Sequence, residues 1–204
     1  MKIGILGAGN VGGNLGQAWA AHGHEIVFGV RDPQSAKVRS LLNKIGRNAR
    51  AASVSEAASF GEVIVLAVNW SAVPDVLHNA GDLSGKILVD ATNRITPGAS
   101  DRAPSAAEHV AELAPGTRVV KAFNTIGADH FTNPWIGSES ASMFICGDDA
   151  DAKAIVAGLA QELGFDVVDA GPLSNAHLLE SLALLWIRLS RSLGRNIGFK
   201  LLRG

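Results

Sequence analysis

The chain has no tyrosine and a single cysteine, and both shortages exclude chemistry. Without tyrosine it cannot use the Tyr–Lys pair by which short-chain dehydrogenases transfer a proton. With Cys146 alone it can form no intrachain disulfide framework and no zinc site built on several cysteines. We therefore expect a protein of a reducing, cytoplasmic environment with no metal site.

Charge of one sign and long apolar runs are also missing. The formal net charge is −1, so we expect no broad attraction to nucleic acid or to a membrane surface. No apolar run reaches the roughly 20 residues that span a bilayer, and no signal-peptide cleavage site follows the short apolar start. Hydrophobic residues make up 47% of the 204, which predicts a globular chain around one main core.

Short β-branched runs alternate with helical patterns in the first 140 residues. Strands are predicted at 2–6, 25–30, 62–68, 86–91 and 118–123, and helices at 11–22, 33–45, 71–79 and 105–113. This order predicts an α/β Rossmann fold, a doubly wound parallel sheet with right-handed crossovers.

The last third of the chain ends in a long apolar helix. A strand at 142–147, a helix at 150–163 and a strand at 165–171 precede that helix, which starts near Ser174. We expect residues 1–140 to form the Rossmann domain. Residues 141–204 are expected to form a small C-terminal α/β lobe, or to pack with the first part as one unit.

Polar loops follow five of the predicted strands. In an open parallel sheet, ligands bind beyond the carboxyl ends of the strands. The loops that would meet at that edge are residues 7–12, 31–32, 69–70, 92–94 and 124–127. The sequence therefore predicts one binding cleft along this edge.

The first of these loops carries Gly7, Gly9 and Gly12 in a G-x-G-x-x-G pattern between a strand and a helix. Gly7 would allow the tight turn, Gly9 the approach of a pyrophosphate, and Gly12 close packing of helix on strand. The free amides of the helix start would hold the phosphates. A tight turn without ligand is the alternative. The predicted contacts are Gly7, Ala8, Gly9, Asn10, Val11 and Gly12.

The second loop, VRDP, has a basic residue next to an acidic one. They stand at the position where NAD-binding and NADP-binding chains carry different residues. An acid that ends the strand would bind the ribose hydroxyls of NAD, whereas an arginine binds the 2′-phosphate of NADP. We assign Arg31 to the phosphate, and Asp32, followed by Pro33, to the N-cap of the helix 33–45. Two alternatives stay open: a solvated Arg31, and a strand end one residue later that makes Asp32 the reader of NAD.

With these motifs the chain resembles the NADPH-dependent reductases of the deazaflavin coenzyme F-420 (F-420:NADP oxidoreductases), to which the ferric-reductase domains of the STEAP membrane proteins are related. The resemblance runs through GILGAGNVG (4–12), VFGVRDP (27–33), VIVLAV (63–68), VDATN (89–93), VVKAFNTIGADHFTNP (119–134), FICGDDADAK (144–153) and LGFDVVDAGPLSNAHLLESLALLW (163–186). It implies that residues 1–140 bind NADP(H).

The resemblance also implies particular cofactor contacts. Val30 and Arg31 would take the 2′-phosphate, but Val30 stands where relatives often have Ser or Thr, so one hydrogen bond is missing. Further contacts are implied in the later loops, at Val68, Asn69, Trp70, Asn93 and Asn124.

The expected activity is hydride transfer between NADP(H) and a small acceptor, either an F-420-like deazaflavin or a flavin. Such transfer needs placement more than an acid or base, and no catalytic dyad is evident. His130 is the one candidate, with a hydrogen-bonded loop histidine as the alternative. Two other functions stay open: an NADPH-dependent reductase of free flavin, ferric chelate or a small carbonyl, and a non-catalytic NADP(H)-binding redox sensor. A β-hydroxyacid dehydrogenase would need a longer second domain.

The C-terminal helix has leucines at helical spacing, at positions 178, 182, 185, 189 and 193. A helix this apolar is buried or shared with a partner. We expect a homodimer interface or a wall of the redox site, with core packing as the alternative. Basic residues that follow Glu180 would bind the acidic tail of a deazaflavin or form a solvated face: Arg188, Arg191, Arg195, Lys200 and Arg203.

Overall fold

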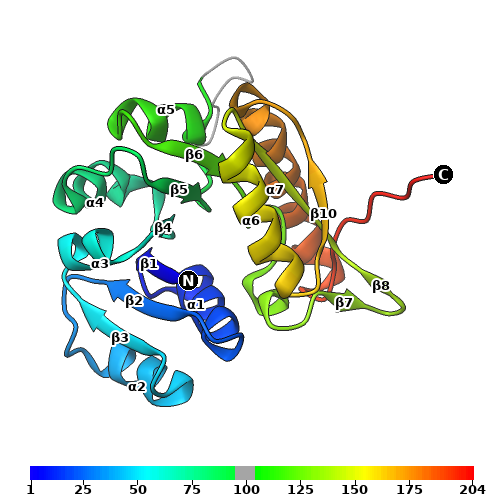
Figure 1. Cartoon of the computed structure of the whole chain (residues 1–204). Coiled ribbons are helices and arrows are strands. Elements are labelled where there is room, and N and C mark those ends of the chain that lie inside the picture. Colours follow the sequence, from blue (N-terminus) through cyan, green and yellow to red (C-terminus); the bar gives the residue numbers. More distant parts are fainter. Residues whose placement is uncertain (95–103) are drawn as a thin grey trace.

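The computed structural model describes residues 1–94 and 104–204 and has the predicted α/β Rossmann fold (Figure 1). One eight-stranded sheet has the order β10-β9-β6-β5-β4-β1-β2-β3. Its strands are β1 (Lys2–Leu6), β2 (Glu25–Gly29), β3 (Ala49–Ala52), β4 (Val63–Leu66), β5 (Ile87–Asp90), β6 (Arg118–Lys121), β9 (Ser142–Gly147) and β10 (Asp166–Asp169). A separate hairpin pairs β7 (Trp135–Ile136) with β8 (Glu139–Ser140).

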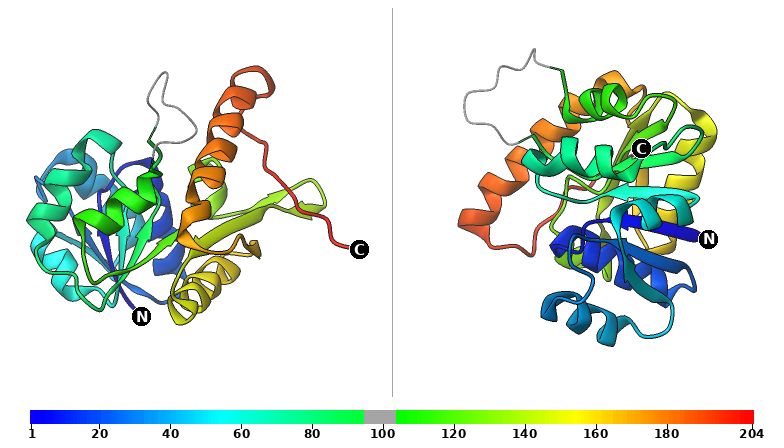
Figure 2. Two further views of the ribbon diagram at one scale, coloured as in Figure 1. Left: turned by 90° about the horizontal axis from the view of Figure 1, so that it is seen from above. Right: turned by 90° about the vertical axis from the view of Figure 1, so that its left-hand side faces the viewer.

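Helices cover both faces of this sheet, as the two views of Figure 2 show. The α-helices are α1 (Asn10–Ala21), α2 (Ala36–Ile45), α3 (Val54–Phe60), α4 (Val73–Ala80), α5 (Ala106–Leu113), α6 (Ala150–Glu162) and α7 (Ala176–Leu193). Short 3-10 helices are η1 (Trp70–Ala72), η2 (Ala128–Phe131) and η3 (Leu173–Asn175). In the described part of the chain, no helix has the length and apolar character that crossing a membrane requires.

The sheet separates two hydrophobic cores because neighbouring side chains of a strand point to opposite faces. In β4, Val63 and Val65 belong to the core under α1 and α6, whereas Ile64 and Leu66 belong to the core under α3, α4, α5 and α7. All four side chains are fully buried. Burial on both faces explains why the run 62–68 is apolar without alternation.

The predicted parallel sheet is confirmed for β1 to β6, and the later strands extend it with one antiparallel pair. β9 runs antiparallel to β6, and β10 runs parallel to β9. The chain between β6 and β9 passes through η2 and the hairpin β7–β8, and an antiparallel neighbour needs no crossover helix. Since β9 and β10 extend the same sheet, the boundary at residue 140 stays a prediction.

Two elements of the main Rossmann part, β3 and α3, were absent from the sequence prediction, as was the hairpin β7–β8. The edge strand β3 reads ARAA, which has neither β-branched residues nor alternation. The helix α3 begins with a full capping box, in which Ser53 and Glu56 bond each other's backbone amides. That S-x-x-E signal was present in the sequence and could have located the helix.

The predicted start of the second helix was wrong. α2 begins at Ala36 with Ser35 at the N-cap position, and Asp32 does not cap it. Instead, Oδ1 of Asp32 accepts a hydrogen bond from the amide of Gln34 at 2.9 Å. A short carboxylate that bonds the amide two residues on closes a turn, and this local bond competes with helix capping.

Candidate functional site

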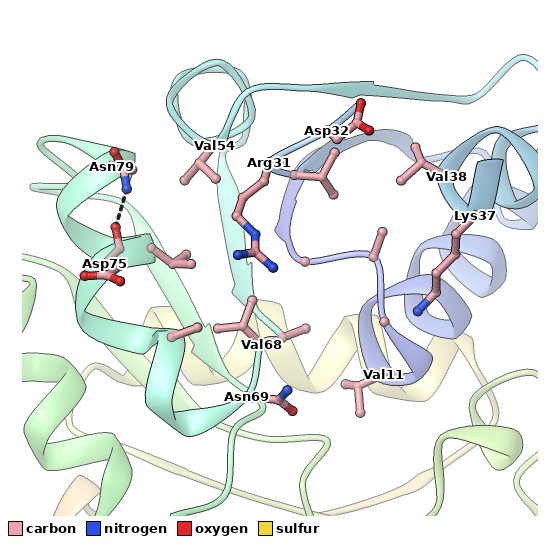
Figure 3. A pocket seen from close by; sticks show the side chains of 18 of the residues that line it. Val11, Arg31, Asp32, Lys37, Val38, Val54, Val68, Asn69, Asp75 and Asn79 are labelled. Atoms are coloured by element: carbon pink, nitrogen blue, oxygen red, sulfur yellow. Dashed lines mark hydrogen bonds between the residues drawn. The ribbon is translucent and has the colours of Figure 1, made fainter. Parts of the chain in front are cut away.

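A cleft of about 930 Å³ lies beyond the carboxyl ends of β1, β2 and β4 (Figure 3). In the sheet register Leu6 pairs with both Gly29 and Leu66, so the loops that follow these strands emerge side by side. The volume is in the range of cofactor pockets. Of the predicted contacts, those that line the cleft are Gly7, Ala8, Gly9, Asn10, Val11, Val30, Arg31, Val68 and Asn69.

The three motif glycines meet different constraints. Gly7 has a φ of +112°, and a Cβ there would lie 2.5 Å from the Ala67 carbonyl oxygen. A Cβ on Gly12 would lie 2.2 Å from the carbonyl oxygen of Gly7. Around a Cβ on Gly9, nothing comes within 4 Å. The fold therefore requires glycine at 7 and 12, whereas the bare backbone at Gly9 leaves space for a ligand.

The start of α1 directly follows Gly9. No side chain caps it, and its first turn contains no acidic residue. The first amides of a helix have no partner within the helix, and the helix dipole favours an anion at this end. With the open space at Gly9, this helix start has the features of a pyrophosphate site.

The two charges of the second loop face different ways. Figure 3 shows the Arg31 guanidinium extending into the cleft, while the Asp32 carboxylate lies at its edge. Asp32 is held in the turn by Gln34. Among the described residues, Arg31 makes no ion pair. Arg31 is therefore the charge available to a ligand.

The third loop divides between the cleft and its surroundings. Val68 and Asn69 line the cleft, but Trp70 is not part of its lining. The Trp70 ring instead packs near His109 on α5, at 5.7 Å between ring centroids, and beneath the Arg94 guanidinium at 5.9 Å. A direct cofactor contact of Trp70 thus has no support from its position.

Asn93 and Asn124 join the loops that follow β5 and β6. Asn124 Nδ2 donates to Asn93 Oδ1 at 3.0 Å and to the Leu179 carbonyl of α7 at 3.2 Å. Asn93 Nδ2 donates to the Asn124 carbonyl at 3.2 Å. Within residues 1–94 and 104–204, the buried Oδ1 of Asn124 has no hydrogen-bond partner.

The buried ammonium group of Lys121 connects the loop that follows β5 with α7. Nζ of Lys121 lies 2.8 Å from Asp90 Oδ2 and 3.1 Å from Glu180 Oε1, and it also donates to the Thr92 carbonyl. Glu180 in turn accepts from the amide of Ala106. Lys121 and Asp90 are fully buried, so loss of Lys121 would leave the Asp90 carboxylate without an ion-pair partner, at a cost of about 3–5 kcal/mol. The network connects α7 and the start of α5 to the carboxyl ends of β5 and β6.

The other titratable candidates are engaged elsewhere. His130 is buried, and its Nε2 lies 3.1 Å from the Arg195 carbonyl oxygen, as in the hydrogen-bonded alternative. Burial raises the pKa of the Cys146 thiol to about 12, so it is unreactive in the folded chain. Of the predicted basic group, Arg195 pairs with Asp129, and Lys200 and Arg203 pair with Asp166.

The sequence prediction missed five polar residues of the cleft, Ser35, Lys37, Ser71, Asp75 and Asn79. They lie at the N-cap of α2, in its first turn, in η1 and on α4, rather than directly after a strand. A search limited to the residues after each strand could not find them.

Comparison with known proteins identifies the family. Residues 2–94 match the family model described as NADP oxidoreductase, coenzyme F420-dependent. A crystal structure from Arthrobacter sp. FB24, described as an F420-dependent NADP reductase, matches with a TM-score of 0.90 and 33% identity over 100% of both chains. A reductive aminase from Aspergillus terreus, solved with NADPH, shares the fold at a TM-score of 0.69 and 23% identity, over 95% of this chain and 62% of that one.

The curated relatives of this chain include metalloreductases. Rat metalloreductase STEAP3 is 34% identical over 184 residues, which are 90% of this chain and 36% of that protein. The chain therefore spans little more than a third of the length of these relatives. The end-to-end match at 33% identity shows the family, and the chain belongs to the F420-dependent NADP oxidoreductases, a family of NADP-dependent enzymes.

Proposed function

We propose that this chain transfers a hydride between NADP(H) and an F-420-like deazaflavin or a flavin-type acceptor. The observation that carries the proposal is the Arg31 guanidinium extended into a cleft that also holds the open backbone of Gly9. The end-to-end relative described as an F420-dependent NADP reductase favours the deazaflavin.

In this proposal the cleft binds the adenosine and pyrophosphate half of the cofactor. Residues 7–11 would hold the pyrophosphate, Arg31 the 2′-phosphate, and Val68 and Asn69 would line the adenosine side. Gly12 acts by allowing α1 to pack closely on the loop. Asn93 and Asn124 lie outside the cleft, one and two strands further along the sheet from β4, where the nicotinamide would lie.

The nicotinamide supplies the chemistry, since its C4 gives or takes the hydride. The chain supplies placement and exclusion of water, which is sufficient for direct transfer between stacked rings. The network of Lys121, Asp90 and Glu180 would fix the loops against which the acceptor packs. We assign no general acid or base, and His130 keeps a structural role at Arg195.

Reduction of a ferric chelate or of free flavin is the second candidate. The observation that favours it is the 34% identity with a protein named a metalloreductase. This chain matches only 36% of that protein, so the match does not carry over the activity of the whole protein.

A homodimer is part of the proposal. On α7, Leu179, Ala183 and Trp186 are buried in the chain's own core, whereas Leu178 and Leu185 are exposed. The core-packing interpretation therefore accounts for one side of the helix, and the other side is available to a second copy. Light scattering during size exclusion would measure the mass of the particle, and a monomer at all concentrations would contradict the dimer.

The cofactor assignment is tested by titrating NADPH and NADH against the parent and Arg31→Ala. Loss of a charge-assisted phosphate contact should weaken NADPH by about 10–100-fold and leave NADH unchanged. Arg39→Ala is the matched control, because Arg39 is exposed on α2 outside the cleft. Equal affinity of the parent for NADPH and NADH would contradict the role of Arg31.

The acceptor is tested by following NADPH oxidation with F-420, FMN and a ferric chelate in parallel. We expect turnover with F-420 to exceed that with the other two. Faster turnover with the chelate would favour the second candidate. Tight NADPH binding without turnover of any acceptor would favour a redox sensor.

A further inference from the structure

The position of Val30 raises the question of what assists Arg31 at the 2′-phosphate. Val30 lines the cleft but offers no side-chain hydrogen bond. The rim between β2 and α2 also contributes Asp32, Ser35 and Lys37 to the cleft lining. Of these three, Ser35 and Lys37 can donate a hydrogen bond to a phosphate, and ionised Asp32 cannot.

We propose that Lys37, assisted by Ser35, completes the 2′-phosphate subsite and decides the preference of this chain for NADP over NAD. The inference rests on the proposed function, because it assigns further residues to the same cofactor.

Lys37 occupies a position between two hollows. It lines the main cleft, and it also lines a smaller hollow of about 280 Å³ together with Ala8, Gly9 and Asn10. Figure 3 shows Arg31 and Lys37 on two sides of the glycine-rich loop, with the Lys37 amine extended toward that loop. Both side chains are exposed, so their long stems are free to turn toward a common anion.

The charges of the rim make Lys37 necessary. Arg31 brings one positive charge into the cleft, and the neighbouring Asp32 carboxylate at the cleft edge offsets part of its attraction for an anion. A phosphate monoester carries about −1.5 to −2 at neutral pH. Lys37 makes the rim positive, and among the described residues it makes no ion pair that would neutralise it.

Two features at the start of α2 favour a bound anion and destabilise the helix when no anion is bound. Lys37 lies in the first turn, where the helix dipole repels a cation by roughly 0.3–1 kcal/mol, and this turn has no acidic residue. Ser35 occupies the N-cap position, but its hydroxyl makes no cap hydrogen bond. A phosphate at this rim would offset both features, since it pairs with the amine and accepts from the hydroxyl.

The test compares the affinities of NADPH and NADH for the parent, Lys37→Ala, Ser35→Ala and the control Arg39→Ala. We expect Lys37→Ala to weaken NADPH about tenfold or more and to leave NADH within twofold. Ser35→Ala should weaken NADPH about threefold, and Arg39→Ala should change neither affinity. The affinities for adenosine 2′,5′-bisphosphate and 5′-AMP should change in the same way as those for NADPH and NADH, although neither ligand has a nicotinamide.

Two results would overturn the inference. If Lys37→Ala keeps the NADPH affinity of Arg39→Ala, Lys37 does not contact the phosphate. If NADPH and NADH weaken equally, Lys37 binds the pyrophosphate and does not select NADP. In both cases NADPH still binds the parent, whereas failure of the proposed function would appear as a parent that binds no NADPH.

Discussion

Four helix starts of this protein, those of α1, α2, α3 and α5, are of two contrasting kinds. At α3 and α5 a serine and a glutamate form a complete capping box, through Ser53 with Glu56 and Ser105 with Glu108. At α1 and α2 no side chain makes a cap bond, and the first turn has no acidic residue. Residues at the starts of α1 and α2 line the cleft, and those two capping boxes lie outside its lining.

The difference shows two ways to satisfy the same physical demand. The first amides of every helix need acceptors from outside the helix. A capping box supplies them permanently, and its carboxylate would also repel a phosphate. An uncapped start leaves the amides to a ligand and gives up part of the stability of the empty protein. α4 borders the cleft with Asp75 in its first turn, so we expect it to face the uncharged adenosine rather than a phosphate.

The largest effect is expected where the fold and the cleft depend on one glycine. Gly12→Ala places a Cβ 2.2 Å from the Gly7 carbonyl oxygen, so the backbone must shift. We expect a loss of about 2–3 kcal/mol in the free energy of unfolding, together with loss of NADPH binding. Denaturant unfolding without cofactor and an NADPH titration measure the two effects. Retained stability would show that the loop adapts at no cost.

Gly9→Ala separates binding from folding. Its Cβ meets nothing within 4 Å, so the free energy of unfolding should fall by less than about 1 kcal/mol. NADPH and NADH should both weaken about tenfold or more, because the methyl group stands where the pyrophosphate approaches. The same titrations and unfolding curves apply. If the affinities for NADPH and NADH do not change, the pyrophosphate does not bind at Gly9. The start of α1 would then not be a ligand-binding helix start.

Ser105→Ala tests the capped kind of helix start. Its hydroxyl accepts from the Glu108 amide at 3.1 Å, and loss of such a cap costs about 1 kcal/mol. NADPH affinity should not change. Ser35→Ala is the opposite case, because the Ser35 hydroxyl makes no cap hydrogen bond. Without cofactor, its free energy of unfolding should change by only a few tenths of a kcal/mol. Equal destabilisation by the two substitutions would abolish the distinction between the two kinds.

The smallest effect concerns the pKa of Glu56. Hydrogen bonds from the side chain and then the backbone of Ser53 hold this pKa below its ordinary value of 4.5. A lowered pKa stabilises the fold above the unfolded value, and that stabilisation disappears as the pH falls through the folded value. Ser53→Ala should raise the Glu56 pKa toward 4.5 in an NMR titration. Asp82, whose pKa is lowered by Ser84, should titrate as before.

Local sequence signals predicted those parts of the fold that local physics decides. The strands at Lys2–Leu6 and Ser142–Gly147 lie where their apolar runs predicted them. β3 could not be predicted because ARAA pairs only as an edge strand beside β2. The reversed direction of β9 depends on its pairing with β6, a contact between residues far apart in the chain.

The site divides in the same way. The sequence predicted that Gly7, Gly9 and Arg31 lie at one cleft because they follow β1 and β2 directly, and all three do line it. Asp32 was misjudged because a carboxylate beside a proline suits both a turn and a helix cap, and only the backbone path decides between them. Lys37 was overlooked because a lone lysine in a helix carries no local signal.

By itself, the sequence determined the Rossmann order, the family and the glycine-rich loop of the cleft, because each follows from residues close together in the chain. The tertiary structure alone decided which charges face the cleft, how Lys121 is neutralised by Asp90 and Glu180, and which side of α7 is left uncovered. These features depend on contacts between elements that lie far apart in the chain. Burial and ion pairing arise from such contacts, so no single segment of the sequence determines them.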